Sequence, residues 1–97
     1  MHIIRIIIPA YVLDKLHWKH HVVEEEVYEL LGGEPKIDFV EKGDVAGENV
    51  YLALGQTESG RYLSVFFIYK KNKEALVLSA RDMARKERRY YAKREKN

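Results

Sequence analysis

The densest group of reactive side chains lies at residues 17 to 21, where His17, Trp18, Lys19, His20 and His21 follow one another. A histidine at the end of a helix can act as a general acid or base, because its ordinary pKa lies near neutrality. It can equally serve only to cap the helix, since cations are favoured at the carboxyl end. His17 and His20 are three residues apart and could share a metal ion, but no further ligands stand out. We therefore expect no metal and no cofactor, and the spacing by itself favours capping.

A second reactive group closes the chain in SARDMARKERRYYAKREKN, residues 79 to 97. Residues 81 to 97 carry a net charge of +5, whereas the first eighty residues sum to −3. On a helix, five basic residues fall within roughly a quarter of the circumference: Arg81, Arg85, Arg88, Arg89 and Lys96. Because the planar fork of arginine suits phosphate or carboxylate, this stripe predicts contact with RNA or an acidic partner. A solvated helix without a partner is the blander alternative.

The other side of that helix would dock on the domain through Met83, Ala84, Tyr90 and Tyr91, with Glu87 among them. A carboxylate at such a position is costly unless it is paired. Its structural role would be a salt bridge to a neighbour such as Arg61. Its functional role would be a carboxylate beside the arginines.

Length and composition limit the classes of protein. A chain of 97 residues, 46% hydrophobic and 33% charged, predicts one folded domain over residues 1–97. It contains no cysteine, which excludes disulfides and thiol nucleophiles. The first apolar run is short and is interrupted by Arg5 and Pro9, so we expect no membrane segment and a cytoplasmic location. The common signatures of nucleotide binding, serine hydrolases and zinc proteases are absent.

The hydrophobic pattern predicts an α+β fold. Leu13, Leu16 and His17 mark one helix, and the pair Gly32-Gly33 would close a second helix through a positive φ. Short turns at 58–60 and 71–73 require antiparallel neighbours. We expect a small antiparallel meander with its helices on one side. Strands are predicted at 2–8, 36–41, 49–56, 61–70 and 74–80, and helices at 10–20, 23–31 and 82–95.

Three stretches together resemble the BrnT family, the toxin half of a bacterial type II toxin–antitoxin pair. KHHVVEEEVYELL (19–31) is similar to the family's Lys-His-Gly-Val turn and the helix after it. LALGQTESGRYLSVFF (52–67) looks like its Leu-Gly turn and Gly-Arg strand opening. SARDMARKERRYY (79–91) resembles its Ser-Ala-Arg segment and Arg-x-Glu-Arg helix. The resemblance implies a RelE-like fold, a ribonuclease that blocks translation, and neutralisation by a BrnA-type antitoxin that binds DNA on behalf of the complex.

The resemblance also implies which residues are functional. At several other positions this chain departs from the family's pattern. Carried over by motif, the candidate catalytic residues are Lys19, His20, Arg61, Arg81 and Glu87, with Arg85, Arg88 and Arg89 as RNA-binding residues. Ile8-Pro9-Ala10 stands where the family has Trp-Asp-Pro. Val50 replaces a basic residue of the second hairpin strand, and Leu76 replaces one in the strand before Ser-Ala-Arg. His21 stands where the family has its turn glycine.

Two classes of function follow. The first is a metal-independent ribonuclease toxin in which Arg81 and Arg85 hold the scissile phosphate and His20 or Glu87 moves protons. The second is a module of the same fold with little or no nuclease activity that binds an antitoxin or a nucleic acid. RNA and a BrnA-type antitoxin are the expected partners, DNA is expected only through the antitoxin, and a homodimer is compatible with either class.

Overall fold

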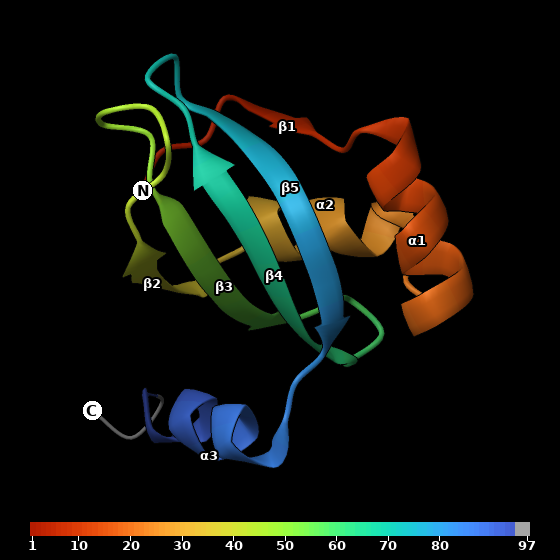
Figure 1. Ribbon diagram of the computed structural model, residues 1–97. Helices are drawn as coiled ribbons and strands as arrows, with labels where there is room; N and C mark the ends of the chain where they lie inside the picture. Colours follow the sequence, from red (N-terminus) through yellow and green to blue (C-terminus); the bar gives the residue numbers. More distant parts are fainter. Residues whose placement is uncertain (95–97) are drawn as a thin grey trace.

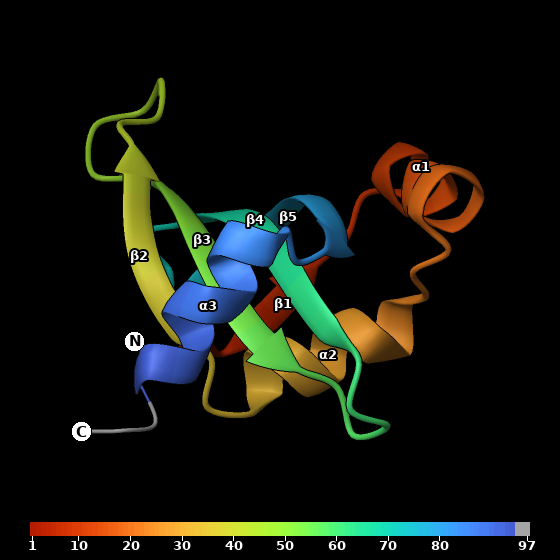
Figure 2. The same cartoon turned by 90° about the horizontal axis from the view of Figure 1, so that it is seen from below.

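The computed structural model describes residues 1–94, which form one five-stranded sheet with helices packed on both of its faces (Figures 1 and 2). The sheet order is β1-β5-β4-β3-β2. The elements follow in the order β1 Arg5–Ile7, α1 Ala10–His20, α2 Glu24–Gly32, β2 Lys36–Glu41, β3 Val50–Gln56, β4 Tyr62–Tyr69, β5 Glu74–Asp82 and α3 Arg85–Arg94.

The four strands from β2 to β5 form the antiparallel meander that the short turns predict. β1 adds to the outer edge of β5 in parallel, with Arg5 opposite Glu74 and Ile7 opposite Leu76, so the whole sheet is mixed. The α+β fold class is therefore confirmed. None of the helices within residues 1–94 is long and apolar enough to cross a bilayer.

Most element boundaries match the hydrophobic pattern, and three differ. β1 is only three residues long, and β5 continues to Asp82, beyond the predicted end at Ala80. Arg81 therefore lies on a strand and not on the terminal helix, which begins at Arg85. The predicted end of that helix at residue 95 lies outside the described residues.

The expectation that all helices cover one side of the sheet is wrong. On β4, Leu63, Val65 and Phe67 are fully buried on the face that α1 and α2 cover. α3 crosses the opposite face of the sheet (Figure 2). There Tyr91 of α3 and Met83 pack with Leu54 into a second, smaller core. Because β3 and β4 are apolar along both faces, each face needs its own cover.

α1 packs against the sheet through Val12 and Leu16, both buried. His17, which helps to mark this helix in the sequence, is exposed to solvent. α2 buries Val27, Leu30 and Leu31, as its helical spacing indicates.

The two helix ends differ in an instructive way. α2 ends at the Gly32-Gly33 pair, but neither glycine takes the positive φ that we predict. α1 ends at His20 and is capped by His21, which adopts the left-handed conformation with φ 53°. The amide of the next residue, Val22, bonds back to the carbonyl of Leu16, and Val22 is fully buried. This turn fixes the direction in which the chain leaves α1 and so the position of His20.

Candidate functional site

A small cleft between α1 and β5 holds one of the predicted site residues, His20. Its volume is about 160 Å³, smaller than a typical site for a drug-sized ligand. Within the part of the chain that the structure describes, the His20 side chain makes no hydrogen bond or ion pair. The imidazole is therefore available to a ligand in the cleft. The lining residues are Tyr11, Val12, Lys15, Leu16, His20, Leu78 and Ser79.

The surroundings of His20 favour its neutral form. Partial burial lowers the pKa of His20, and the nearby charges of Lys19, Arg81 and Lys15 lower it further, against a weaker opposing effect of Asp82. A histidine whose pKa lies below 6.5 is mostly neutral at pH 7, and a neutral imidazole can accept a proton. The cleft thus combines an available base with a positive electrostatic field.

Arg81 and Glu87 form a bidentate ion pair at the junction of β5 and α3. Arg81 Nη1 and Nη2 donate to Glu87 Oε1 and Oε2 at 2.7 and 2.9 Å. The same carboxylate accepts hydrogen bonds from the Ser64 hydroxyl at 2.9 Å and from the Ala84 amide at 2.8 Å. The Arg81 guanidinium also lies over the ring of Phe66. Both side chains are thus held in a single arrangement.

This environment sets the protonation state of Glu87. The hydrogen bonds from Arg81, followed by those from the Ala84 amide and Ser64, outweigh burial and lower the pKa of Glu87 to about 2. A carboxylate with that pKa is a weak base and carries no proton to donate near neutrality. The geometry therefore favours a structural role for Glu87. Its partner is Arg81, so the pairing with Arg61 that we suggest from the sequence is not formed.

Arg61, which directly precedes β4, binds four groups from three other parts of the chain. Its Nε and Nη2 donate to the Asp82 carboxylate at 2.8 and 3.3 Å. Its Nη1 donates to Glu26 at 3.1 Å and to the carbonyl of His21 at 2.7 Å. Its Nη2 also donates to the carbonyl of His20 at 2.9 Å. We call this arrangement the Arg61 clasp.

The clasp engages every donor of the guanidinium, which offers five N–H groups. Two of its acceptors are among the last carbonyls of α1, which have no partner within their own helix. Arg61 therefore fastens the end of α1 to α2 and β5 and leaves no donor for a phosphate in this arrangement. The geometry favours a positioning role, in which Arg61 sets where His20 stands.

The predicted arginine stripe on the terminal helix is only partly present. Arg85 and Arg89 are exposed and make no hydrogen bond or ion pair with any residue in the range 1–94. Arg88 is exposed as well, but its guanidinium lies 3.9 Å from the centre of the Tyr62 ring on the sheet. Arg81 lies on β5 and is engaged by Glu87. Lys96 lies outside the described residues. The stripe as predicted is wrong, and Arg85 and Arg89 remain as its freely exposed cations.

The docking face of α3 is also narrower than predicted. Tyr91 and Met83 are buried, whereas Ala84 and Tyr90 are exposed. The Tyr90 hydroxyl still reaches the Asp38 carboxylate at 3.3 Å, and the Lys36 ammonium lies over its ring. Tyr90 therefore fastens the helix to the edge strand β2 from the surface.

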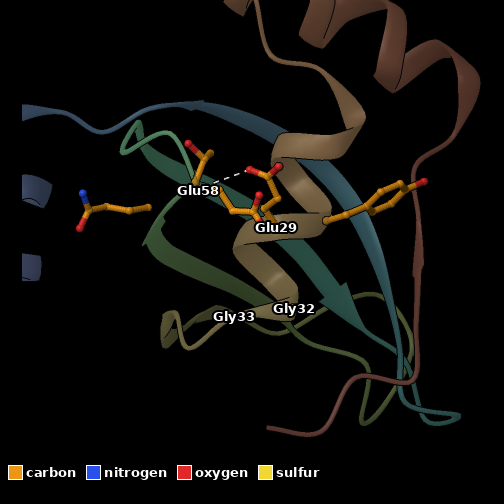
Figure 3. Close-up of a pocket in the computed structure, with 7 residues that line it drawn as sticks. Glu29, Gly32, Gly33 and Glu58 are labelled. Carbon is orange, nitrogen blue, oxygen red and sulfur yellow. Dashed lines mark hydrogen bonds between the residues drawn. The ribbon is translucent and has the colours of Figure 1, made fainter.

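A larger hollow of about 440 Å³ lies between the end of α2 and the turn after β3 (Figure 3). Its charged lining residues are acidic, whereas the charges around the His20 cleft are mainly basic. Glu29 and Glu58 lie next to each other in the lining of the hollow, with the Glu58 amide donating to the Glu29 carboxylate at 3.1 Å. Two carboxylates repel phosphates, so this hollow does not suit RNA. The remaining lining residues are Tyr28, Gly32, Gly33, Gln56 and Thr57.

Sequence reasoning overlooked Lys15, Ser79 and Asp82 as parts of the site. Lys15 lies four residues after Tyr11 and so shares its helix face, a signal that was available in the sequence. Asp82 lies among the basic residues of the closing stretch and has no local signal of its own. Its partner Arg61 lies 21 residues earlier, and only the β4–β5 pairing brings the two together.

The sequence matches no protein family model and no curated protein. A function is therefore proposed from the geometry of the site together with the resemblance of the sequence to the BrnT family.

Proposed function

We propose that this protein is the toxin of a type II toxin–antitoxin pair and cleaves RNA without a metal ion, with His20 as the base. One observation carries the proposal: an imidazole without a protein partner lines a cleft among the charges of Lys15, Lys19 and Arg81. Neutral imidazole and fixed cations are the groups that phosphodiester cleavage by an adjacent hydroxyl requires.

In the proposed reaction, His20 removes the proton of a ribose 2′-hydroxyl. The 2′-oxygen attacks the neighbouring phosphorus, and the bond from phosphorus to the 5′-oxygen breaks. The leaving oxygen takes a proton from water, giving a 2′,3′-cyclic phosphate and a 5′-hydroxyl end. Lys15 and Lys19 stabilise the negative charge that builds on the phosphoryl oxygens. Arg81 adds its field to the site while it remains bonded to Glu87.

The proposal extends to an antitoxin of the BrnA type that binds α3. Arg85 and Arg89 are exposed and unpaired within the described residues, and they offer planar donors to the carboxylates of an acidic partner. In this proposal the antitoxin, and not the toxin, brings the DNA-binding domain.

A second candidate is a module of the same fold that binds RNA or an antitoxin but does not cleave. One specific observation favours it: Arg61 and Glu87, both predicted catalytic residues, are bonded into the structure. The two candidates share the basic surface and differ in whether His20 transfers a proton.

The test uses purified protein and a labelled single-stranded RNA in the presence of EDTA. The wild-type protein and the matched control His17→Gln, which changes an exposed histidine one turn earlier, are expected to yield cyclic-phosphate ends. His20→Gln is expected to retain its circular dichroism spectrum and to lose at least 100-fold in rate, as removal of a general base does. Cleavage by His20→Gln at the wild-type rate would overturn the mechanism. Intact RNA that nevertheless binds the wild-type protein would favour the second candidate.

A further inference from the structure

The outer face of α1 exposes two large aromatic side chains that the domain itself does not use. Tyr11 is 77% exposed and Trp18, the only tryptophan of the chain, is 71% exposed. Neither ring makes an aromatic or cation–π contact with the rest of residues 1–94. Tryptophan is usually well buried in a domain of this size, and an exposed one marks a surface where something else covers it.

These two rings share one face with a lysine. Tyr11, Lys15 and Trp18 are separated by four and then three residues, the spacing that aligns side chains along a helix. The rise of a helix places the two aromatic positions about 10 Å apart along the axis. Lys15 stands between them, and Lys19 follows on the same flank. We call Tyr11, Lys15, Trp18 and Lys19 the α1 platform.

The charges on the platform favour a polyanion. Lys15 and Lys19 form no ion pair with any residue that the structure describes, and Asp14 is the one carboxylate on this helix. Both lysines act on His20 strongly enough to contribute to its lowered pKa, together with Arg81 of β5. A mainly positive field from two elements, opposed only weakly by Asp82, therefore covers the α1 side of the cleft.

The same arrangement does not suit a protein groove or a lipid surface as well. The apolar stripe of α1 is already used, with Val12 and Leu16 buried against the sheet. The cores of protein interfaces are poor in lysine, whereas here a lysine separates the two rings. An interfacial membrane helix needs a broad apolar face, and two isolated rings do not provide one. Alternating aromatic rings and cations are instead typical of proteins that bind single-stranded nucleic acid.

We propose that the α1 platform binds single-stranded RNA, with unpaired bases stacking on Tyr11 and Trp18 and phosphates contacting Lys15 and Lys19. Tyr11 and Lys15 also line the His20 cleft, so a strand held on the platform runs directly into it. This inference rests on the proposed function and gives it a substrate class: unpaired RNA, selected because a base inside a duplex has no free face to stack.

The experiment uses Trp18 as its own reporter. A short single-stranded 2′-O-methyl oligonucleotide, which lacks the attacking hydroxyl and cannot be cleaved, is titrated into the wild-type protein at low salt. Saturable quenching of tryptophan fluorescence is expected, weakening steeply as salt is added. A duplex of the same sequence is expected to quench at least tenfold more weakly.

Variants then separate stacking from charge, with fluorescence anisotropy of a labelled oligonucleotide as the readout. Trp18→Ala and Tyr11→Ala are each expected to weaken binding about tenfold or more, whereas Trp18→Phe, which keeps a ring, retains most of it. Tyr28→Ala, at a half-exposed tyrosine on α2, is the matched control and is expected to bind as the wild type does.

Binding seen by anisotropy without any change in Trp18 fluorescence would overturn the platform and leave the proposed function standing. Equal quenching by duplex and single strand would overturn stacking. Quenching by anionic lipid vesicles but not by the oligonucleotide would assign the face to a membrane surface. The probe cannot be cleaved, so its binding is measured independently of nuclease activity. A protein that binds the probe as expected but leaves ordinary RNA intact would contradict the proposed nuclease and not the platform.

Discussion

The carboxylate of Glu87 accepts two parallel hydrogen bonds from the guanidinium of Arg81, and it also caps the amide of Ala84 at the start of α3. One side chain thus joins the last strand to the last helix. Because Ser64 on β4 bonds the same carboxylate, the junction is also fastened to the centre of the sheet. The integrity of this corner should therefore depend on the ionised form of Glu87.

Glu87→Gln is expected to lower the free energy of unfolding at pH 7 by about 1–3 kcal/mol, because it leaves the Arg81 charge without its partner. Urea denaturation measures the change. Glu41→Gln, at an exposed glutamate of β2, is the control and should alter stability by less than about 0.5 kcal/mol. Equal stability of Glu87→Gln and the wild type would contradict the structural role.

The same pair predicts a direction with pH. The pKa of Glu87 falls on folding from its ordinary 4.5 to about 2, so the folded state binds fewer protons than the unfolded state between those values. The stability that Glu87 contributes is present above pH 4.5 and is lost as the pH falls toward 2. The free energy of unfolding of Glu87→Gln should therefore fall less steeply than that of the wild type as the pH is lowered from 4.5 toward 2. The fall should not vanish, since Arg61 also lowers the pKa of Asp82.

Arg61→Ala is expected to destabilise the fold by about 1–3 kcal/mol, after allowance for the partial exposure of the clasp. Arg61→Lys should recover only part of this, because one ammonium cannot reach all the acceptors that the guanidinium fork reaches. Arg85→Ala, at an exposed arginine without a partner in residues 1–94, is the matched control. An Arg61→Ala protein as stable as the wild type in urea denaturation would contradict the clasp.

His21→Gly is expected to stabilise the protein by about 1 kcal/mol. His21 is exposed and holds φ at 53°, a conformation that costs a residue with a Cβ but costs glycine little. The contact that His21 makes with Arg61 goes through its carbonyl, which glycine retains. His17→Gly, inside the helix, should have the opposite sign at a similar magnitude. Thermal or urea denaturation of both variants decides the question.

Helix α1 and its end at residue 20, the positions of α2 and β2, and the antiparallel pairing of β2 to β5 could all be predicted, because each depends on local spacing or on turn length. The end of β5 could not. Arg81 and Asp82 remain on the strand because they pair with Ser64 and Leu63 of β4, and no local pattern carries that register. The face that α3 covers was equally hidden, since it depends on apolar residues of other strands.

The candidate site divides in the same way. The Lys19-His20 pair could be recognised from residue types and helix ends, and Arg85 and Arg89 from charge. The engagement of Arg61, Arg81 and Glu87 could not, because their partners are distant in sequence or lie across an element boundary. The Arg61 clasp joins residues separated by up to 41 positions. The sequence alone therefore does not distinguish a charged residue that is bound within the fold from one that is free to contact a ligand.

Double substitution of Arg85 and Arg89 by alanine should weaken the binding of RNA at low salt and flatten its salt dependence. The slope of log affinity against log salt should fall by roughly two if both residues contact phosphates. Lys42→Ala with Lys71→Ala, on the loops next to β2 and β4, removes the same charge elsewhere and should leave the slope nearly unchanged. An unchanged slope in the Arg85 and Arg89 variant would contradict contacts between these residues and RNA phosphates, and would leave the antitoxin as the proposed partner of α3.

The rate of RNA cleavage should rise with pH through an apparent pKa below 6.5 and then level off before neutrality. The sign follows from the base role: His20 acts when neutral, and its surroundings lower its pKa from 6.5. Lys19→Ala removes one of the charges that lower this pKa, so its rising limb should move to higher pH. A rate that increases as the pH falls below 6 would contradict proton removal by His20.

The Arg61 clasp has a kinetic consequence as well. Its acceptors belong to the end of α1, the first turn of α2 and the last residue of β5, so it can close only when the early helices and the final strand have already met. We expect the clasp to form after the folding barrier, and interactions absent from the transition state act chiefly on the rate at which the native state opens. The clasp should therefore work as a latch that prolongs the lifetime of the folded protein and has little effect on how fast it folds.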